Sequence, residues 1–173
     1  MDYSKIKAFA FDVDGVMTDG GLLCDLNGEL YRTFDAKDGF GIRMAVMNGY
    51  PVGIITGGRS RTIVARAASF GVPEEDCHLH SRDKMEDLDS FCTRHGIAPE
   101  NVLYMGDDIP DLAVMKAVGV GAAPADAIPE ALEAADVVTS KGGGRGAVRE
   151  IIETVLRAQG RWDFDVHGYK AKF

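Results

Sequence analysis

The sequence predicts a single α/β domain in which a parallel β-sheet is covered by helices on both faces. Two observations predict this class. Short apolar runs bounded by Gly, Pro or Asp alternate along the chain with segments whose apolar residues recur at helical spacing. The runs are apolar throughout, as expected for strands covered on both faces, and a strand–helix–strand order favours parallel neighbours.

The composition is consistent with this class. The 173 residues suffice for one domain with a buried core, and 46% hydrophobic and 27% charged residues are ordinary globular usage. A net charge of -8 argues against a sequence-independent nucleic-acid binder, because no basic stripe offsets the acid. No apolar run approaches the ~20 residues of a membrane-spanning helix. The first residues lack a signal-peptide pattern, so we expect a cytoplasmic protein without membrane or nucleic-acid partners.

The predicted elements follow in order along the chain. The strands are residues 6–11, 51–56, 101–105, 119–122 and 136–139. The helices are predicted from apolar stripes that include Ile42 and Val46, Ile63 and Ala67, Leu88 and Phe91, Leu112 and Met115, and Ile151 and Val155. Glycines follow several of these stripes, and Gly71 is typical of a helix C-terminal cap.

One segment, residues 20–34, departs from the strand–helix alternation. Extended residues flank the dipeptide Asn27-Gly28. This dipeptide is a strong hairpin signal, because a type I′ turn needs a positive φ at both central residues. The sequence therefore predicts a β-hairpin that projects after the first strand and is too short to form a cap domain.

Polar residues follow the first three predicted strands. They are Asp12 and Asp14 after the first, Thr56 and Gly57 at the end of the second, Asp107 and Asp108 after the third, and Lys84 before the third helix. Ligands of an open parallel sheet bind beyond the carboxyl ends of its strands, so we expect these groups to gather there. Clustered carboxylates call for a cation, and oxygen ligands favour Mg²⁺. A single Asp after a strand is often only a helix N-cap, and it is the joint occurrence that predicts a site.

In this order the motifs resemble those of the haloacid dehalogenase superfamily of phosphatases. They are Asp12-Val13-Asp14-Gly15-Val16, Ile55-Thr56-Gly57, Lys84, and Gly106-Asp107-Asp108-Ile109-Pro110-Asp111. The hairpin, residues 38–42 and residues 143–150 further resemble its capless branch, which contains 3-deoxy-D-manno-octulosonate 8-phosphate phosphatase. The resemblance covers residues 1–160 and implies a Rossmann-like three-layer parallel sheet with no cap domain. Residues 161–173 are then a C-terminal tail.

The resemblance implies a role for each of these residues. Asp12 is the nucleophile that becomes an aspartyl-phosphate, and Asp14 protonates the leaving oxygen and then activates water. The Asp12 carboxylate, the Asp14 backbone carbonyl and the Asp107 carboxylate hold Mg²⁺. The Thr56 hydroxyl and the Gly57 N–H donate hydrogen bonds to phosphate oxygens.

Four further residues belong to the implied site. Lys84 offsets negative charge on nucleophile and phosphate, while Asp108 and Asp111 help to fix Lys84 or metal-bound water. An N-cap for the helix that begins near Pro110 is the alternative role of Asp108. Arg66 matches a family position that pairs with a sugar-acid carboxylate, and a helix-surface arginine is the alternative.

The implied reaction is the hydrolysis of 3-deoxy-D-manno-octulosonate 8-phosphate to the free sugar acid and phosphate, a step of lipopolysaccharide precursor synthesis. Gly58 is neutral where relatives acting on nine-carbon acids tend to carry an acid, and Ser69 replaces a basic residue. Both favour the eight-carbon substrate. A phosphatase for a nine-carbon keto-acid 9-phosphate, a non-catalytic oligomerisation module and a response-regulator receiver are the alternatives.

The absence of a cap also implies a partner. In this branch a tetramer closes the cleft, with a neighbour's hairpin or tail over the entrance. Leu22, Leu23 and Leu26 on the hairpin are then interface contacts, and packing on their own subunit is the alternative. The loop that carries Arg145 lacks the ending of a nucleotide P-loop, so we expect a structural role for it.

Overall fold

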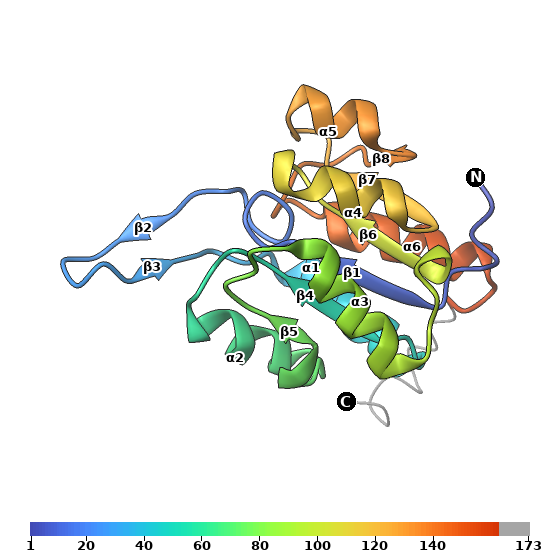
Figure 1. Ribbon diagram of the computed structural model, residues 1–173, viewed down its shortest axis with the longest axis horizontal. Coiled ribbons are helices and arrows are strands. Elements are labelled where there is room, and N and C mark those ends of the chain that lie inside the picture. Colours follow the sequence, from blue (N-terminus) through green and yellow to red (C-terminus); the bar gives the residue numbers. More distant parts are fainter. Residues whose placement is uncertain (163–173) are drawn as a thin grey trace.

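The computed structural model describes residues 1–162 and has the predicted α/β architecture (Figure 1). Within these residues six parallel strands form one sheet, in the order β5-β4-β1-β6-β7-β8. They are β1 (Ala8–Phe11), β4 (Val52–Ile55), β5 (Cys77–His78), β6 (Val102–Met105), β7 (Val120–Ala123) and β8 (Val137–Val138). The five predicted strands and their parallel arrangement are confirmed.

Helices cover both faces of the sheet and give the fold three layers. On one face lie α1 (Ala36–Met47), α2 (Arg61–Ser69) and α6 (Ala147–Ala158); on the other lie α3 (Lys84–His95), α4 (Leu112–Ala117) and α5 (Pro129–Ala134). The sequence analysis missed α5, because this short helix buries only Ala131 and so lacks an apolar stripe. The described residues contain no helix with the length and hydropathy needed to cross a bilayer.

The strand register determines which loops meet. Phe11 of β1 pairs with Ile54 of β4 on one side and with Met105 of β6 on the other. The Asp12 N–H then donates a hydrogen bond to the Met105 carbonyl oxygen at 3.1 Å. The loops after β1, β4 and β6 therefore leave the sheet together at one edge, where a ligand site of an open parallel sheet is expected.

The β-hairpin is confirmed, but its predicted turn type is wrong. β2 (Leu23–Cys24) and β3 (Leu30–Tyr31) pair antiparallel and project from the body of the molecule (Figure 1). Gly28 has a φ of 80°, whereas His80 is the one non-glycine residue with positive φ in the described part, so Asn27 is not left-handed. The Asp25 carboxylate accepts the N–H groups two and four residues ahead, which stabilises a longer loop than a type I′ turn.

A glycine-rich segment, residues 142–146, packs under the loop that follows β1. A Cβ atom on Gly143 would lie 1.9 Å from the Gly15 carbonyl oxygen, so the two backbones touch. Gly144 has a φ of 59° and donates its N–H to the Val16 carbonyl oxygen at 2.9 Å. Arg145 forms an exposed ion pair at 2.9 Å with a carboxylate of the same loop. These contacts agree with the structural role expected for the segment.

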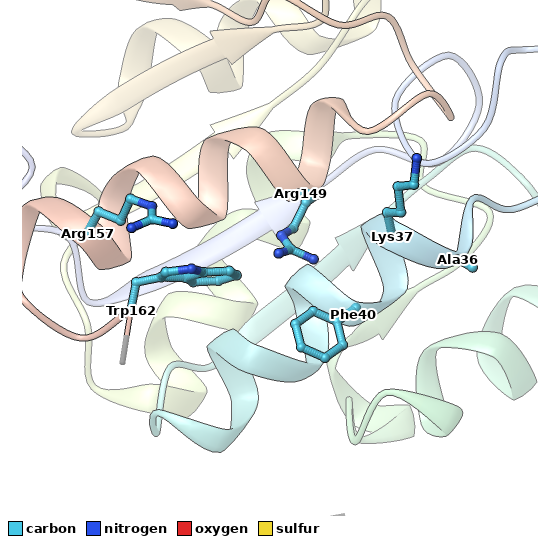
Figure 2. A pocket seen from close by; sticks show the side chains of 6 residues that line it. All are labelled: Ala36, Lys37, Phe40, Arg149, Arg157 and Trp162. Atoms are coloured by element: carbon cyan, nitrogen blue, oxygen red, sulfur yellow. The ribbon is translucent and has the colours of Figure 1, made fainter. Parts of the chain in front are cut away.

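A buried carboxylate joins the N-terminal turn of α1 to the N-terminus of α6. Asp38 accepts hydrogen bonds from the N–H groups of Gly146 and Arg149 at 3.2 and 2.8 Å, and burial raises its pKa to about 6. The Arg149 guanidinium lies 4.8 Å from the Phe40 ring and 4.6 Å from the Trp162 ring, beside a hollow of about 680 Å³ (Figure 2). Of the predicted tail, residues 161–173, the part beyond Trp162 lies outside the described residues.

Candidate active site

Three carboxylates meet where β1 and β6 end. One oxygen from each of Asp12, Asp107 and Asp111 lies within 4.8 Å of the others. Asp12 and Asp111 are buried and Asp107 is half-buried. Gly15 makes room for the cluster, because a Cβ atom there would lie 2.0 Å from Oδ2 of Asp107. Burying like charges this close together is unfavourable unless a cation offsets them.

Two oxygens of this cluster fit a divalent metal ion. Oδ1 of Asp12 and Oδ1 of Asp107 are buried and have no hydrogen-bond partner within the described residues. Buried polar atoms are normally hydrogen-bonded, so two buried carboxylate oxygens without a hydrogen bond from any described residue fit direct ligation of a cation. Carboxylate oxygens are ligands that hard cations such as Mg²⁺ prefer.

The electrostatics of the cluster favour the same conclusion. Burial, followed by repulsion from the neighbouring carboxylates, raises the pKa of Asp107 to about 7. Burial also raises the pKa of Asp12 to about 6, against the opposing attraction of Lys84. Without a metal the cluster therefore resists full ionisation at neutral pH. A bound cation removes that resistance.

Lys84 lies between two of the carboxylates. Its Nζ atom is 3.1 Å from Oδ2 of Asp12 and 2.6 Å from Oδ1 of Asp111. Burial lowers the pKa of Lys84, but the two carboxylates raise it by more, so the ammonium stays charged. Lys84 is the first residue of α3. The Asp83 side chain is the N-cap of this helix and accepts the N–H groups of Met85 and Glu86.

Asp111 has partners on both of its oxygens. Oδ1 accepts the Lys84 ammonium and the Tyr104 hydroxyl, while Oδ2 accepts the backbone N–H groups of Asp107 and Asp108 at 3.1 and 3.3 Å. It is therefore placed to hold Lys84. The fully buried Tyr104 was missed by the sequence analysis. The signal for it is a single hydroxyl in an otherwise apolar strand, two residues before the Gly-Asp-Asp turn.

One hollow of about 370 Å³ at this edge contains the predicted site. Except for Arg66, every residue predicted for the site lines it: Asp12, Asp14, Thr56, Gly57, Lys84, Asp107, Asp108 and Asp111. The Thr56 hydroxyl oxygen accepts the N–H of Gly58 at 3.1 Å, which leaves its proton available to a ligand. No atom lies within 4 Å of the place that a Cβ on Gly57 would occupy, so its backbone is open to the hollow.

Two of the predicted residues are placed differently from the rest. Asp108 accepts the N–H of Ile109 at 2.7 Å and is the N-cap of the 3-10 helix Ile109–Asp111, as its alternative role required. Arg66 stacks its guanidinium 4.3 Å from the Phe70 ring and lines a separate hollow together with Ser69. The structure does not bring Arg66 to the carboxylate cluster of its own chain.

The sequence analysis also missed the partner of Asp14. Arg32, directly after β3, places its Nε and Nη2 atoms 2.6 and 2.8 Å from the two Asp14 carboxylate oxygens. A cation at the base of a hairpin has no sequence pattern that pairs it with a residue 18 positions earlier. Leu22 and Leu30 also line the hollow, so the hairpin base forms part of its wall.

The hairpin also carries exposed leucines. Leu23 is 71% exposed, and Leu22 and Leu26 are exposed as well. Packing of these leucines on their own subunit, the alternative considered above, is therefore wrong for Leu23 and Leu26.

Comparisons with known proteins bear on this geometry. A profile of the haloacid dehalogenase-like hydrolase family matches residues 79–151. The chain is 41% identical over 161 residues to 3-deoxy-D-manno-octulosonate 8-phosphate phosphatase of Salmonella typhi, which covers 92% of this chain and 84% of the relative. The crystal structure of the Yersinia pestis enzyme of that name has a TM-score of 0.88 at 38% identity, over 92% of this chain and 85% of that one.

A second crystal structure carries ligands. It is 3-deoxy-D-manno-octulosonate 8-phosphate phosphatase from Moraxella catarrhalis in complex with a magnesium ion, a phosphate ion and a KDO molecule. It has a TM-score of 0.88 at 32% identity and covers 99% of this chain and 95% of that one. The two solved structures therefore share the fold of this chain over nearly all of its length.

Proposed function

The chain belongs to the haloacid dehalogenase-like hydrolases, and from that premise we propose that it hydrolyses 3-deoxy-D-manno-octulosonate 8-phosphate to the sugar acid and phosphate. It is a phosphoric monoester hydrolase, and the reaction serves lipopolysaccharide precursor synthesis. The observation that carries the proposal is the cluster of Asp12, Asp107 and Lys84, with two orphaned carboxylate oxygens, in a hollow at the strand ends.

Mg²⁺ is the cofactor of the proposed reaction. The carboxylates of Asp12 and Asp107, together with the backbone carbonyl of Asp14, would hold it, and their free oxygens are the support for this assignment. When bound, Mg²⁺ shields the repulsion between the nucleophile and the phosphate. Asp111 is occupied by Lys84 and so acts through that residue.

The chain's own residues supply the covalent chemistry. Asp12 attacks phosphorus, the bond to the sugar oxygen breaks, and Asp14 gives that oxygen a proton. Asp14 then takes a proton from water, which attacks the aspartyl-phosphate and restores Asp12. Both carboxyl groups line the same hollow, two residues apart on one loop, which supports their action on a single phosphorus.

Phosphate binding is assigned to groups from the neighbouring strand ends. The Thr56 hydroxyl and the Gly57 backbone N–H are the proposed hydrogen-bond donors, and the lining of the hollow by both residues supports this assignment. Lys84, held by Asp111, brings a positive charge beside Asp12. These donors are fixed before substrate binds, which is the arrangement that stabilises developing charge at low reorganisation cost.

Closure of the hollow is assigned to assembly. We propose a homotetramer in which the exposed leucines of the hairpin pack on a neighbouring subunit. A two-stranded hairpin of this size needs such support. Arg66 is proposed to bind the sugar-acid carboxylate. Because it lines a different hollow in its own chain, that role requires a neighbouring subunit's site.

A phosphate-release screen tests the proposed function. Purified protein is assayed against a panel of sugar phosphates, including the eight-carbon 8-phosphate and a nine-carbon keto-acid 9-phosphate, with Mg²⁺ and after exhaustive chelation. We expect the highest kcat/KM for the eight-carbon ester, and no activity without the metal. Preference for the nine-carbon ester would transfer the assignment to that substrate. Absence of phosphate release from every ester would favour a non-catalytic module.

A further inference from the structure

We propose that Arg32 is a positioning residue that aims the Asp14 carboxylate at the leaving oxygen and thereby links the hairpin to proton transfer. The inference rests on the proposed phosphatase function. It concerns a residue of the hairpin, whereas the groups assigned to the chemistry come from the loops after β1, β4 and β6 and from the start of α3.

The geometry of the pair fixes an orientation. The Arg32 Nε and Nη2 atoms bind the two oxygens of one Asp14 carboxylate, at 2.6 and 2.8 Å. Two parallel hydrogen bonds to a planar guanidinium set both the position and the plane of the carboxylate, which a single bond does not. Only 2% of the Arg32 side chain is exposed, whereas 31% of the Asp14 side chain is exposed, so Asp14 stays accessible from the hollow while its partner is buried.

The hairpin in turn fixes Arg32. Its Nη1 atom donates to the Leu30 carbonyl oxygen at 3.1 Å, and Glu29 accepts the Ser60 hydroxyl at 2.5 Å. The Nη2 atom would lie 3.0 Å from a Cβ on Gly58, so the guanidinium also abuts the loop after β4. The turn end of β3 is thus hydrogen-bonded through Glu29 to the N-cap of α2, and Arg32, at the other end of β3, extends to Asp14.

The chemistry gives this link a consequence. Asp14 must serve two atoms in turn: in its protonated form it gives a proton to the leaving oxygen, and as a carboxylate it takes one from the attacking water. Arg32 occupies one acceptor position on each carboxyl oxygen and leaves the others for that proton. A displacement of about 1 Å at a reacting group can cost about 100-fold in rate. The cost falls on the step that needs the proton, so it depends on the leaving group. A sugar alcohol leaves only with a proton, whereas p-nitrophenolate needs little help.

The experiment compares Arg32→Met with Arg32→Lys on two substrates. For Arg32→Met we expect kcat/KM to fall by about 100-fold for the sugar phosphate and by less than about fivefold for p-nitrophenyl phosphate. Arg32→Lys keeps the positive charge but cannot form both hydrogen bonds of the planar guanidinium. Its kcat/KM for the sugar phosphate should be about tenfold higher than that of Arg32→Met. Arg61→Met, which removes an exposed arginine paired with Glu74 at 2.7 Å, is the matched control and should match wild type.

A double-mutant cycle with Asp14→Asn separates positioning from other roles. If Arg32 acts through Asp14, adding Arg32→Met to Asp14→Asn causes no further loss for the sugar phosphate. Additive losses, or equal losses of Arg32→Met on both substrates, would overturn the inference by assigning Arg32 to phosphoryl binding or to folding. A wild-type protein inactive on every ester would instead refute the proposed function, and this inference with it.

Discussion

The strand-end cluster and the β-hairpin, although they adjoin, are built in opposite ways. In the cluster, three loops of a central parallel sheet hold Asp12, Asp111 and Lys84 in contact, buried and at 2.6–3.1 Å. The hairpin has two-residue strands, and its Leu23 and Leu26 are exposed. The first region is held by contacts between buried groups, whereas the hairpin is held through Glu29 and Arg32 and leaves its leucines exposed.

This difference separates two parts of the proposed reaction. The groups for phosphoryl transfer come from the sheet edge, where the hydrophobic core fixes the strands and so fixes the loops. We propose that the groups that close the hollow and contact the sugar come from the hairpin and from a second subunit. Changes in the cluster should therefore affect all phosphate esters alike, and changes in the outer hairpin should affect large esters most.

The largest effect is expected from the nucleophile. Asp12→Asn should reduce kcat by at least about 10⁴-fold for sugar and aryl phosphates alike, because it removes the attacking oxygen without changing volume. Phosphate release gives the rates, and circular dichroism with size-exclusion chromatography checks that the fold and assembly persist. A folded Asp12→Asn protein with substantial turnover would refute the covalent mechanism.

A smaller effect is expected from the group that holds Lys84. Asp111→Asn removes the negative charge that pairs with Lys84 at 2.6 Å, and we expect kcat to fall by about 10–100-fold on both classes of ester. Tyr104→Phe deletes one hydrogen bond to the same carboxylate and serves as the graded comparison, with a loss of less than about tenfold. Equal effects of the two variants would argue against Asp111 acting through Lys84.

The hairpin tip should give a selective effect. Replacing Leu23 and Leu26 by Asp should dissociate the oligomer and lower sugar-phosphate turnover by about tenfold, with less than about a twofold change for a small aryl phosphate. Light scattering reports the assembly, and steady-state kinetics report the selectivity. A wild-type protein that is fully active as a monomer would reject assembly as the means of closure.

The smallest expected effect concerns stability and pH. A carboxyl group whose pKa is higher in the folded than in the unfolded state favours folding as the pH falls through that value. The pKa values of Asp107 and Asp12, about 7 and about 6, exceed the ordinary 3.8. The chelated protein should therefore unfold at a higher temperature at pH 5.5 than at pH 8.

The metal should reverse this trend. Mg²⁺ needs the ionised carboxylates, so it competes with protons and should raise the unfolding temperature more at pH 8 than at pH 5.5. Differential scanning calorimetry with and without Mg²⁺ measures both shifts. An equal metal-induced shift at the two pH values would place the binding site away from Asp12 and Asp107.

The comparison also explains what could be predicted from the sequence. Asp12, Thr56 and Asp107 were predicted together because each follows an apolar run, and parallel strands bring such positions to one edge. Arg32 and Tyr104 were not predicted. The role of Arg32 depends on where the hairpin returns to the sheet, and the role of Tyr104 depends on the direction of one side chain in a buried strand. The turn at Gly28 is not the predicted type I′ turn, because the Asp25 carboxylate accepts backbone N–H groups of the loop and so helps to set its conformation.

The covalent step at Asp12 is the central claim, and it can be tested by trapping. Asp14→Asn protein is mixed with p-nitrophenyl phosphate and Mg²⁺, quenched in acid, reduced with borohydride and analysed by peptide mass spectrometry. The leaving group needs no proton, so phosphorylation should proceed while hydrolysis stalls. The account predicts a burst of about one equivalent of p-nitrophenol per site and conversion of residue 12 to homoserine. Absence of the burst, or modification at any other residue, would contradict it.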